Sequence, residues 1–65
     1  MNYGTLIKEL RNKLLLTQEE LAKKIGVSFA TVNRWEGSKH APTMKYRRVI
    51  RSLCKKASIK EEDYL

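Results

Sequence analysis

The chain has 65 residues, with 14 lysines and arginines against 7 acidic residues, which gives a formal net charge of +7 at pH 7. One cysteine and one histidine exclude an internal disulfide and a self-contained zinc site, and no apolar run approaches the roughly 18 residues of a membrane span. A chain of this size buries too small a core to form a deep enzyme cleft. Its positive charge is compatible with a polyanionic partner and also with an ordinary soluble surface.

Apolar residues recur every three or four positions at the start of the chain, as on one face of a helix. These residues are Leu6, Ile7, Leu10 and Leu14. They predict a first helix over about Thr5 to Leu14, with Asn2 or Thr5 as its N-cap. Leu15 breaks the period, and we expect its side chain to be exposed.

A capping box marks the start of a second helix. Thr17 and Glu20 have the T-x-x-E spacing, and Leu16 and Leu21 are placed to close a hydrophobic staple around the cap. Gly26 ends this helix, because glycine takes a positive φ in a turn at no steric cost.

The third helix is short and begins after Ser28, the next expected cap. Its inward stripe is Val32 and Trp35, and Gly37 supplies its C-terminal stop. We expect Trp35 in the core and not stacked on a base. The stretch 18–37 therefore predicts two short helices that cross steeply around one turn, a helix-turn-helix unit.

Pro42 and Thr43 precede a fourth helix over about Met44 to Lys56, which has a clean apolar stripe. Its opposite face carries six bases: Lys45, Arg47, Arg48, Arg51, Lys55 and Lys56. We expect this face to be solvated, with Lys45 and Arg48 placed to reach a phosphate backbone. A Ser58–Glu61 capping box predicts a last short helix over about residues 59–65. With no period-2 strand, the fold class is all-α.

With these residues in view, the chain resembles the phage-repressor and Cro-like helix-turn-helix family of prokaryotic DNA-binding regulators. The resemblance covers about residues 5–57 and depends on joint spacing: L-R-x-x-x-L at 10–15, L-T-Q-E-E-L-A at 16–22, I-G-V-S at 25–28, T-V-x-R-W-E at 31–36, then Pro42. It implies a compact, lambda-repressor-like domain of four to five helices over residues 1–65, with the DNA-binding motif at 18–37.

The resemblance implies that the third helix, about residues 28–36, lies in the major groove and presents its outward residues to base edges. These base contacts are Phe29, Ala30, Asn33 and Arg34. Asn33 can bond an adenine, an arginine can bond a guanine, and the apolar pair can touch a thymine methyl. Phe29 is alternatively a rim residue of the core or a protein-contact anchor, and Asn33 an ordinary surface residue.

The resemblance also places Gln18 on the DNA backbone. The other expected phosphate contacts surround the same surface and are Thr17, Ser28, Thr31, Ser38, Lys39 and His40. Relatives often carry Asn-Gly where this chain has Gly37-Ser38, an exchange that removes a side chain which helps to hold a phosphate. His40 is alternatively a plain loop residue.

Two further positions follow from the resemblance. Relatives with Arg and Glu where this chain has Arg11 and Glu36 join the first helix to the end of the third through a largely buried ion pair. This pair is structural and sets the angle of the recognition helix. Family members usually have Gly or a polar residue in place of Leu15.

The sequence thus predicts a sequence-specific binder of double-stranded DNA that acts as a transcriptional regulator of the repressor type. The alternatives are an antitoxin-type interaction module that also binds DNA, and the DNA-targeting domain of a larger protein. We expect a homodimer through the C-terminal segment (Ile59, Tyr64, Leu65, with Met44), because these apolar residues have little core left to join. The alternative is that they close the open end of the core. We expect no catalysis, cofactor, metal, small-molecule ligand or membrane contact, and a cytoplasmic, nucleoid-associated location.

Overall fold

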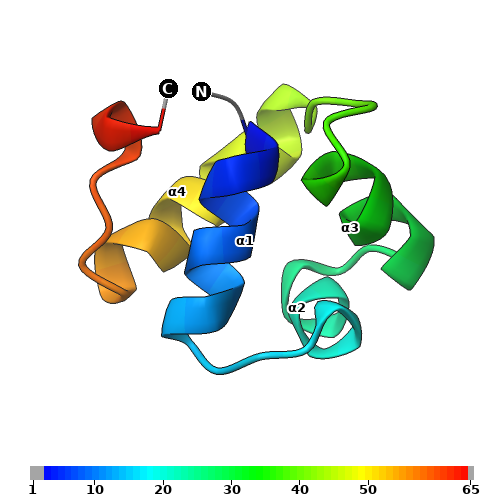
Figure 1. Cartoon of the computed structure of the whole chain (residues 1–65), viewed down its shortest axis with the longest axis horizontal. Coiled ribbons are helices and arrows are strands. Elements are labelled where there is room, and N and C mark those ends of the chain that lie inside the picture. The colour runs from blue at the N-terminus through cyan, green and yellow to red at the C-terminus, as the bar shows by residue number, and fades with distance from the viewer. Residues whose placement is uncertain (1–2, 65) are drawn as a thin grey trace.

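The computed structural model describes residues 3–64 of the chain. Within that range it contains four α-helices, α1 (Tyr3–Lys13), α2 (Gln18–Ile25), α3 (Phe29–Glu36) and α4 (Met44–Lys56), and a short 3₁₀ turn, η1 (Glu61–Asp63). α1 runs through the middle of the molecule, with α2 and α3 on one side and the C-terminal segment on the other (Figure 1). The predicted all-α class is confirmed, and none of these helices is long and apolar enough to cross a membrane.

The core is built from the apolar stripes of all four helices. Its buried members are Leu6, Ile7, Leu10, Leu21, Ala22, Ile25, Val32, Trp35, Ile50, Leu53, Cys54 and Ala57. The prediction that Trp35 belongs to the core is confirmed, since its side chain is 4% exposed and its ring lies 5.9 Å from that of Tyr46. This core fixes α3 from behind and leaves its other face free.

The predicted start of the first helix is wrong by two residues. α1 begins at Tyr3, so Thr5 lies inside the helix, and Asn2 lies outside the described residues. Gly4 explains how so early a start is possible. A Cβ atom on Gly4 would lie 2.7 Å from the Trp35 carbonyl oxygen and 2.7 Å from Ser38 Oγ. The missing side chain therefore lets the first turn of α1 pack directly on the end of α3.

All four described α-helices end in the same way. The residues after them with left-handed backbone are Leu15 (φ 58°), Gly26 (φ 93°), Ser38 (φ 60°) and Ser58 (φ 58°). In each case the next N–H bonds back to a carbonyl five residues earlier, for example Lys39 to Arg34 at 3.1 Å. Gly37 is the C-cap of α3 as expected, but its φ of −81° shows that Ser38 makes the left-handed turn.

The C-terminal segment differs from the prediction. The expected helix over residues 59–65 is reduced to η1, because Ser58 is used as the left-handed residue that ends α4 and cannot cap a new helix. Ile59 and Tyr64 are partly buried and pack against the core, so the expectation that little core is left for them to join is wrong. Leu65 lies outside the described residues, and Met44 is 62% exposed.

Candidate nucleic-acid interface

Two capped helix starts set the position of the helix-turn-helix unit. At α2 the Thr17 N–H donates to Glu20 Oε1 at 2.8 Å, and the Glu20 N–H donates to Thr17 Oγ1 at 3.1 Å, so the predicted capping box is confirmed. The bond from the Thr17 backbone also lowers the pKa of the Glu20 carboxyl. At α3 the Thr31 N–H donates to Ser28 Oγ at 3.2 Å, as the expected cap requires.

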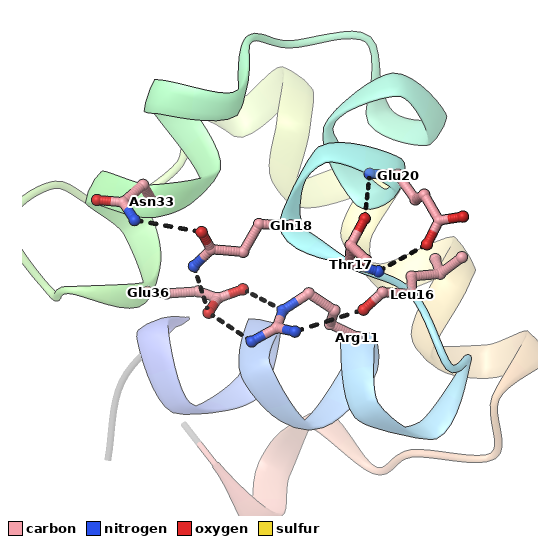
Figure 2. A network of polar contacts seen from close by, with 7 residues as sticks. All are labelled: Arg11, Leu16, Thr17, Gln18, Glu20, Asn33 and Glu36. Atoms are coloured by element: carbon pink, nitrogen blue, oxygen red, sulfur yellow. Dashed lines mark hydrogen bonds and ion pairs between the residues drawn. The ribbon is translucent and has the colours of Figure 1, made fainter.

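A buried carboxylate lies behind the exposed face of α3. Glu36, at the end of α3, is 6% exposed and meets Arg11 of α1 through two bonds, Nε to Oε2 at 2.8 Å and Nη2 to Oε1 at 3.1 Å (Figure 2). The ion pair implied by the resemblance is therefore present. The hydrogen bond from Arg11 to Glu36 raises the pKa of the Arg11 guanidinium. The pair joins the first and third helices at a point where water has little access.

Gln18 extends this pair to the exposed surface. Its Nε2 donates to Glu36 Oε1 at 2.9 Å, and its Oε1 accepts from Asn33 Nδ2 at 3.2 Å (Figure 2). A carboxylate can only accept, so the nitrogen of the Gln18 amide must face Glu36 and its oxygen must face Asn33. That orientation leaves Asn33 with Oδ1 and one amide hydrogen free to bond a ligand.

Sequence reasoning missed the two bonds of Gln18, although it found the residue. A carboxylate has about four acceptor sites, and a single arginine fork fills two of them. The signal that could have indicated the two Gln18 bonds is a polar residue in the first turn of α2, at the position that lies beside the end of α3. The structure thus brings together three residues that the sequence had placed in separate roles: Gln18, Asn33 and Glu36.

The four residues expected to touch bases share the outward face of α3. Phe29, Ala30, Asn33 and Arg34 are all exposed, with Phe29 at 50%. A shallow hollow of about 240 Å³ lies beside them and is lined by Thr31, Arg34, Trp35 and His40. The face combines apolar and polar groups on a rigid helix, which is what reading a base edge requires.

The residues expected to contact phosphates surround this face, but some of their side chains are already bonded within the protein. Lys39 and His40 are exposed in the loop after α3. The hydroxyls of Ser28 and Thr31 lie 2.9 Å apart and bond one another, and Thr17 Oγ1 is occupied by the cap. Ser38 Oγ lies against Gly4 of α1. The hydroxyl groups of Thr17, Ser28 and Thr31 therefore already have a partner within the protein.

Cys54 offers no reactive thiol. It is buried in α4, and burial raises the pKa of its thiol to about 11, which keeps it protonated at neutral pH. Among residues 3–64 there is no cluster of three side chains able to hold a metal ion.

The sequence of this chain is similar to those of proteins described as HTH-type transcriptional regulators. A helix-turn-helix family model matches residues 7–46. Two archaeal relatives are each described as an uncharacterized HTH-type transcriptional regulator. The relative from Archaeoglobus fulgidus is 49% identical over 41 residues, which are 63% of this chain and 58% of the relative. The relative from Methanothermobacter thermautotrophicus is 42% identical over 50 residues, 75% of this chain and 72% of the relative. The first match thus spans less than two thirds of that relative, and no solved structure gives a significant match.

Proposed function

Since the chain belongs to the helix-turn-helix family of Cro/C1 type, whose members bind DNA, we propose that it is a sequence-specific transcriptional regulator of the repressor type. The observation that carries the proposal is the exposed face of α3, held at a fixed angle by the bonds among Arg11, Glu36 and Gln18. A rigid helix with a free outward face and a surrounding positive charge suits the major groove of a duplex.

In this proposal Asn33 is the central base-reading residue. Its free Oδ1 and remaining amide hydrogen match the donor and acceptor that adenine presents in the major groove. Arg34 can bond a guanine, and Phe29 and Ala30 can contact a thymine methyl. A good bidentate pair discriminates by about 1–3 kcal/mol, so one domain with few polar readers gives modest specificity.

Phosphate contacts supply most of the affinity in this proposal. Gln18 keeps one amide hydrogen after its bond to Glu36, and it sits in the first turn of α2, where unbonded backbone N–H groups also favour an anion. Lys39 follows α3 directly and is exposed. The remaining expected contacts are Thr17, Ser28, Thr31, Ser38 and His40.

Repression at a palindromic operator further requires two copies of the domain, with half-sites about 34–36 Å apart. The proposed contact uses the C-terminal segment with Ile59 and Tyr64, which are only partly buried, together with Met44, which is largely exposed. Sizing chromatography at high protein concentration, with and without DNA, tests this point. A strict monomer in both conditions would rule the dimer out.

Selection of bound duplexes from a random pool, repeated at two salt concentrations, tests the function. We expect an enriched palindrome and an affinity that falls as salt rises, because salt competes with the basic side chains for the phosphates. Binding that depends on salt but enriches no sequence would contradict a sequence-specific regulator.

A further inference from the structure

A cationic surface separate from the α3 face lies beside the first turns of α1 and α4, which are joined by the contact between Tyr3 and Arg47. Figure 1 shows these two turns near the top of the view. The surface is a hollow of about 240 Å³ lined by Tyr3, Met44, Arg47, Arg48, Arg51 and Glu61. Apart from Arg48, which the sequence placed within reach of a phosphate backbone, no residue expected to touch DNA lines it. The helix face that the sequence suggested was merely solvated therefore contains a recess with three arginines.

Arg47 is held in place without any ligand. Its Nε donates to the Pro42 carbonyl oxygen at 2.8 Å, and its guanidinium carbon lies 5.1 Å from the centre of the Tyr3 ring. Two independent contacts thus orient the planar group, and its terminal nitrogens make no hydrogen bond to another residue within 3–64. An arginine fixed in this way loses little further freedom when it binds an anion.

The charge of the hollow is poorly neutralised. Among residues 3–64 the salt bridges join Arg11 to Glu36 and Arg51 to Glu61. The second is a 3.5 Å contact in which the Arg51 side chain is 69% exposed, and such surface pairs contribute little. Arg47 and Arg48 have no carboxylate partner in the described part of the chain, so the hollow keeps an excess of positive charge.

We propose that this hollow is a phosphate-binding site. Guanidinium groups match the geometry of a phosphate through parallel N–H bonds, and Arg47 offers one such fork in a preset orientation, with Arg48 and Arg51 completing the charge. The phosphate can belong to a DNA backbone or to a small phosphorylated molecule. The DNA source rests on the proposed function; the site itself does not.

The position of the hollow makes a DNA backbone reachable. Tyr3 also lines a smaller hollow together with Gly4, Ser38, His40 and Ala41, in the loop between α3 and α4. Tyr3 thus borders both hollows, so the surface continues from the loop after α3 to the arginines of α4. A backbone beside α3 could follow that path.

The site is tested first without DNA. The parent protein is titrated with inorganic phosphate and with sodium chloride at equal ionic strength, and binding is followed by the unfolding temperature and by NMR shifts of the arginine side chains. We expect the double variant Arg47→Gln, Arg48→Gln to bind phosphate at least tenfold more weakly than the parent. The control Lys55→Gln, Lys56→Gln removes the same charge from exposed positions at the other end of α4 and should bind as the parent does.

Arg48→Gln alone provides a second variant, because Arg48 makes no ion pair with any residue in the range 3–64. It should fold normally and weaken phosphate binding severalfold. The proposal is overturned if phosphate acts no differently from chloride, or if the arginine and lysine variants respond alike.

Duplex binding by the same variants identifies the source of the phosphate. If DNA supplies it, the arginine pair variant should bind all sequences more weakly by the same factor, and the salt slope should fall by about 1 for each phosphate that is no longer neutralised. If a small molecule supplies it, the duplex affinity of the arginine pair variant should match that of the lysine control, while its phosphate binding stays at least tenfold weaker than that of the parent. A parent that bound no DNA would refute the proposed function, and the phosphate titration would still decide the site.

Discussion

The amide of Asn33 donates to the amide oxygen of Gln18 at 3.2 Å, so the residue proposed to read a base is tied to the residue proposed to bind the backbone. Gln18 in turn donates to Glu36, which Arg11 holds from α1. The side chain of Asn33 is therefore oriented by a chain of bonds that begins in the buried part of the protein.

Gln18→Ala should destabilise the fold as well as weaken DNA binding. The change removes one of the three hydrogen bonds that the Glu36 carboxylate accepts, and Arg11 keeps the other two. A hydrogen bond to a charged group contributes about 1.5–3 kcal/mol, so the free energy of unfolding should fall by about that amount. Urea unfolding measures the loss. Lys23→Ala, an exposed position on α2, serves as the control and should stay close to the parent. Equal stability of Gln18→Ala and the parent would show that the bond to Glu36 contributes nothing.

The ion pair between Arg11 and Glu36 should give a large coupling energy. Arg11→Met leaves the buried Glu36 carboxylate without its cation, and breaking a buried pair in this way typically costs about 3–5 kcal/mol. Glu36→Leu should cost less, because the Arg11 side chain that it leaves unpaired is 23% exposed. The double variant should recover much of this loss, because two apolar side chains can pack together. Unfolding free energies of the four proteins form the cycle, and additive losses would refute the pair as a stabilising unit.

Glycine should stabilise two of the helix ends. Leu15 and Ser38 have left-handed backbone, a conformation that costs a residue with a Cβ atom about 1–2 kcal/mol. Leu15 is also 89% exposed, so its side chain loses little packing when removed. We expect Leu15→Gly and Ser38→Gly each to raise the unfolding free energy by about 1 kcal/mol.

Gly26→Ala is the matched control for these two changes. Gly26 has φ 93° in the turn between α2 and α3, so an alanine there should lower stability by a similar amount. Thermal unfolding of the three variants makes the comparison. Stabilisation by alanine at residue 26, or destabilisation by glycine at residues 15 and 38, would contradict the strain argument.

The capping box of α2 should make stability sensitive to acid. Because bonds from Thr17 lower the pKa of Glu20 in the folded protein below its ordinary value of 4.5, its contribution is present above that pH and is lost as pH falls through the folded pKa. Glu20→Gln keeps the acceptor of the box without its titration. Unfolding temperatures should therefore drop less for Glu20→Gln than for the parent between neutral pH and the acid range. Identical pH profiles would show that Glu20 is not the group responsible.

Local chemistry was the part of the fold that could be predicted from sequence. The cap at Ser28, the Thr17–Glu20 box and the buried stripe with Trp35 depend on residues within a few positions of one another. The Ser58–Glu61 box looked equally good and did not form, because the end of α4 requires Ser58 in a left-handed turn. A capping motif therefore fails to predict a helix start where the same residue is needed to end the preceding helix.

Contacts between distant segments were beyond sequence reasoning. The close approach of Gly4 to Trp35 and the stacking of Arg47 on Tyr3 arise only once the helices have packed. The pairing of Arg11 with Glu36 was predicted only through a family resemblance. The hydrogen bonds of Gln18 could be identified only from the structure. The sequence could name the residues of the α3 face but not the bonds that orient them.

The most direct test of the central claim, that α3 reads base edges, compares two variants in the random-pool selection. Asn33→Ala should relax preference at one base pair of the enriched site, by about 1–3 kcal/mol, and leave the other positions unchanged. Lys39→Ala should weaken binding to all sequences alike and reduce the salt slope by about 1. If both variants keep the sequence profile and affinity of the parent, α3 is not the surface that reads DNA.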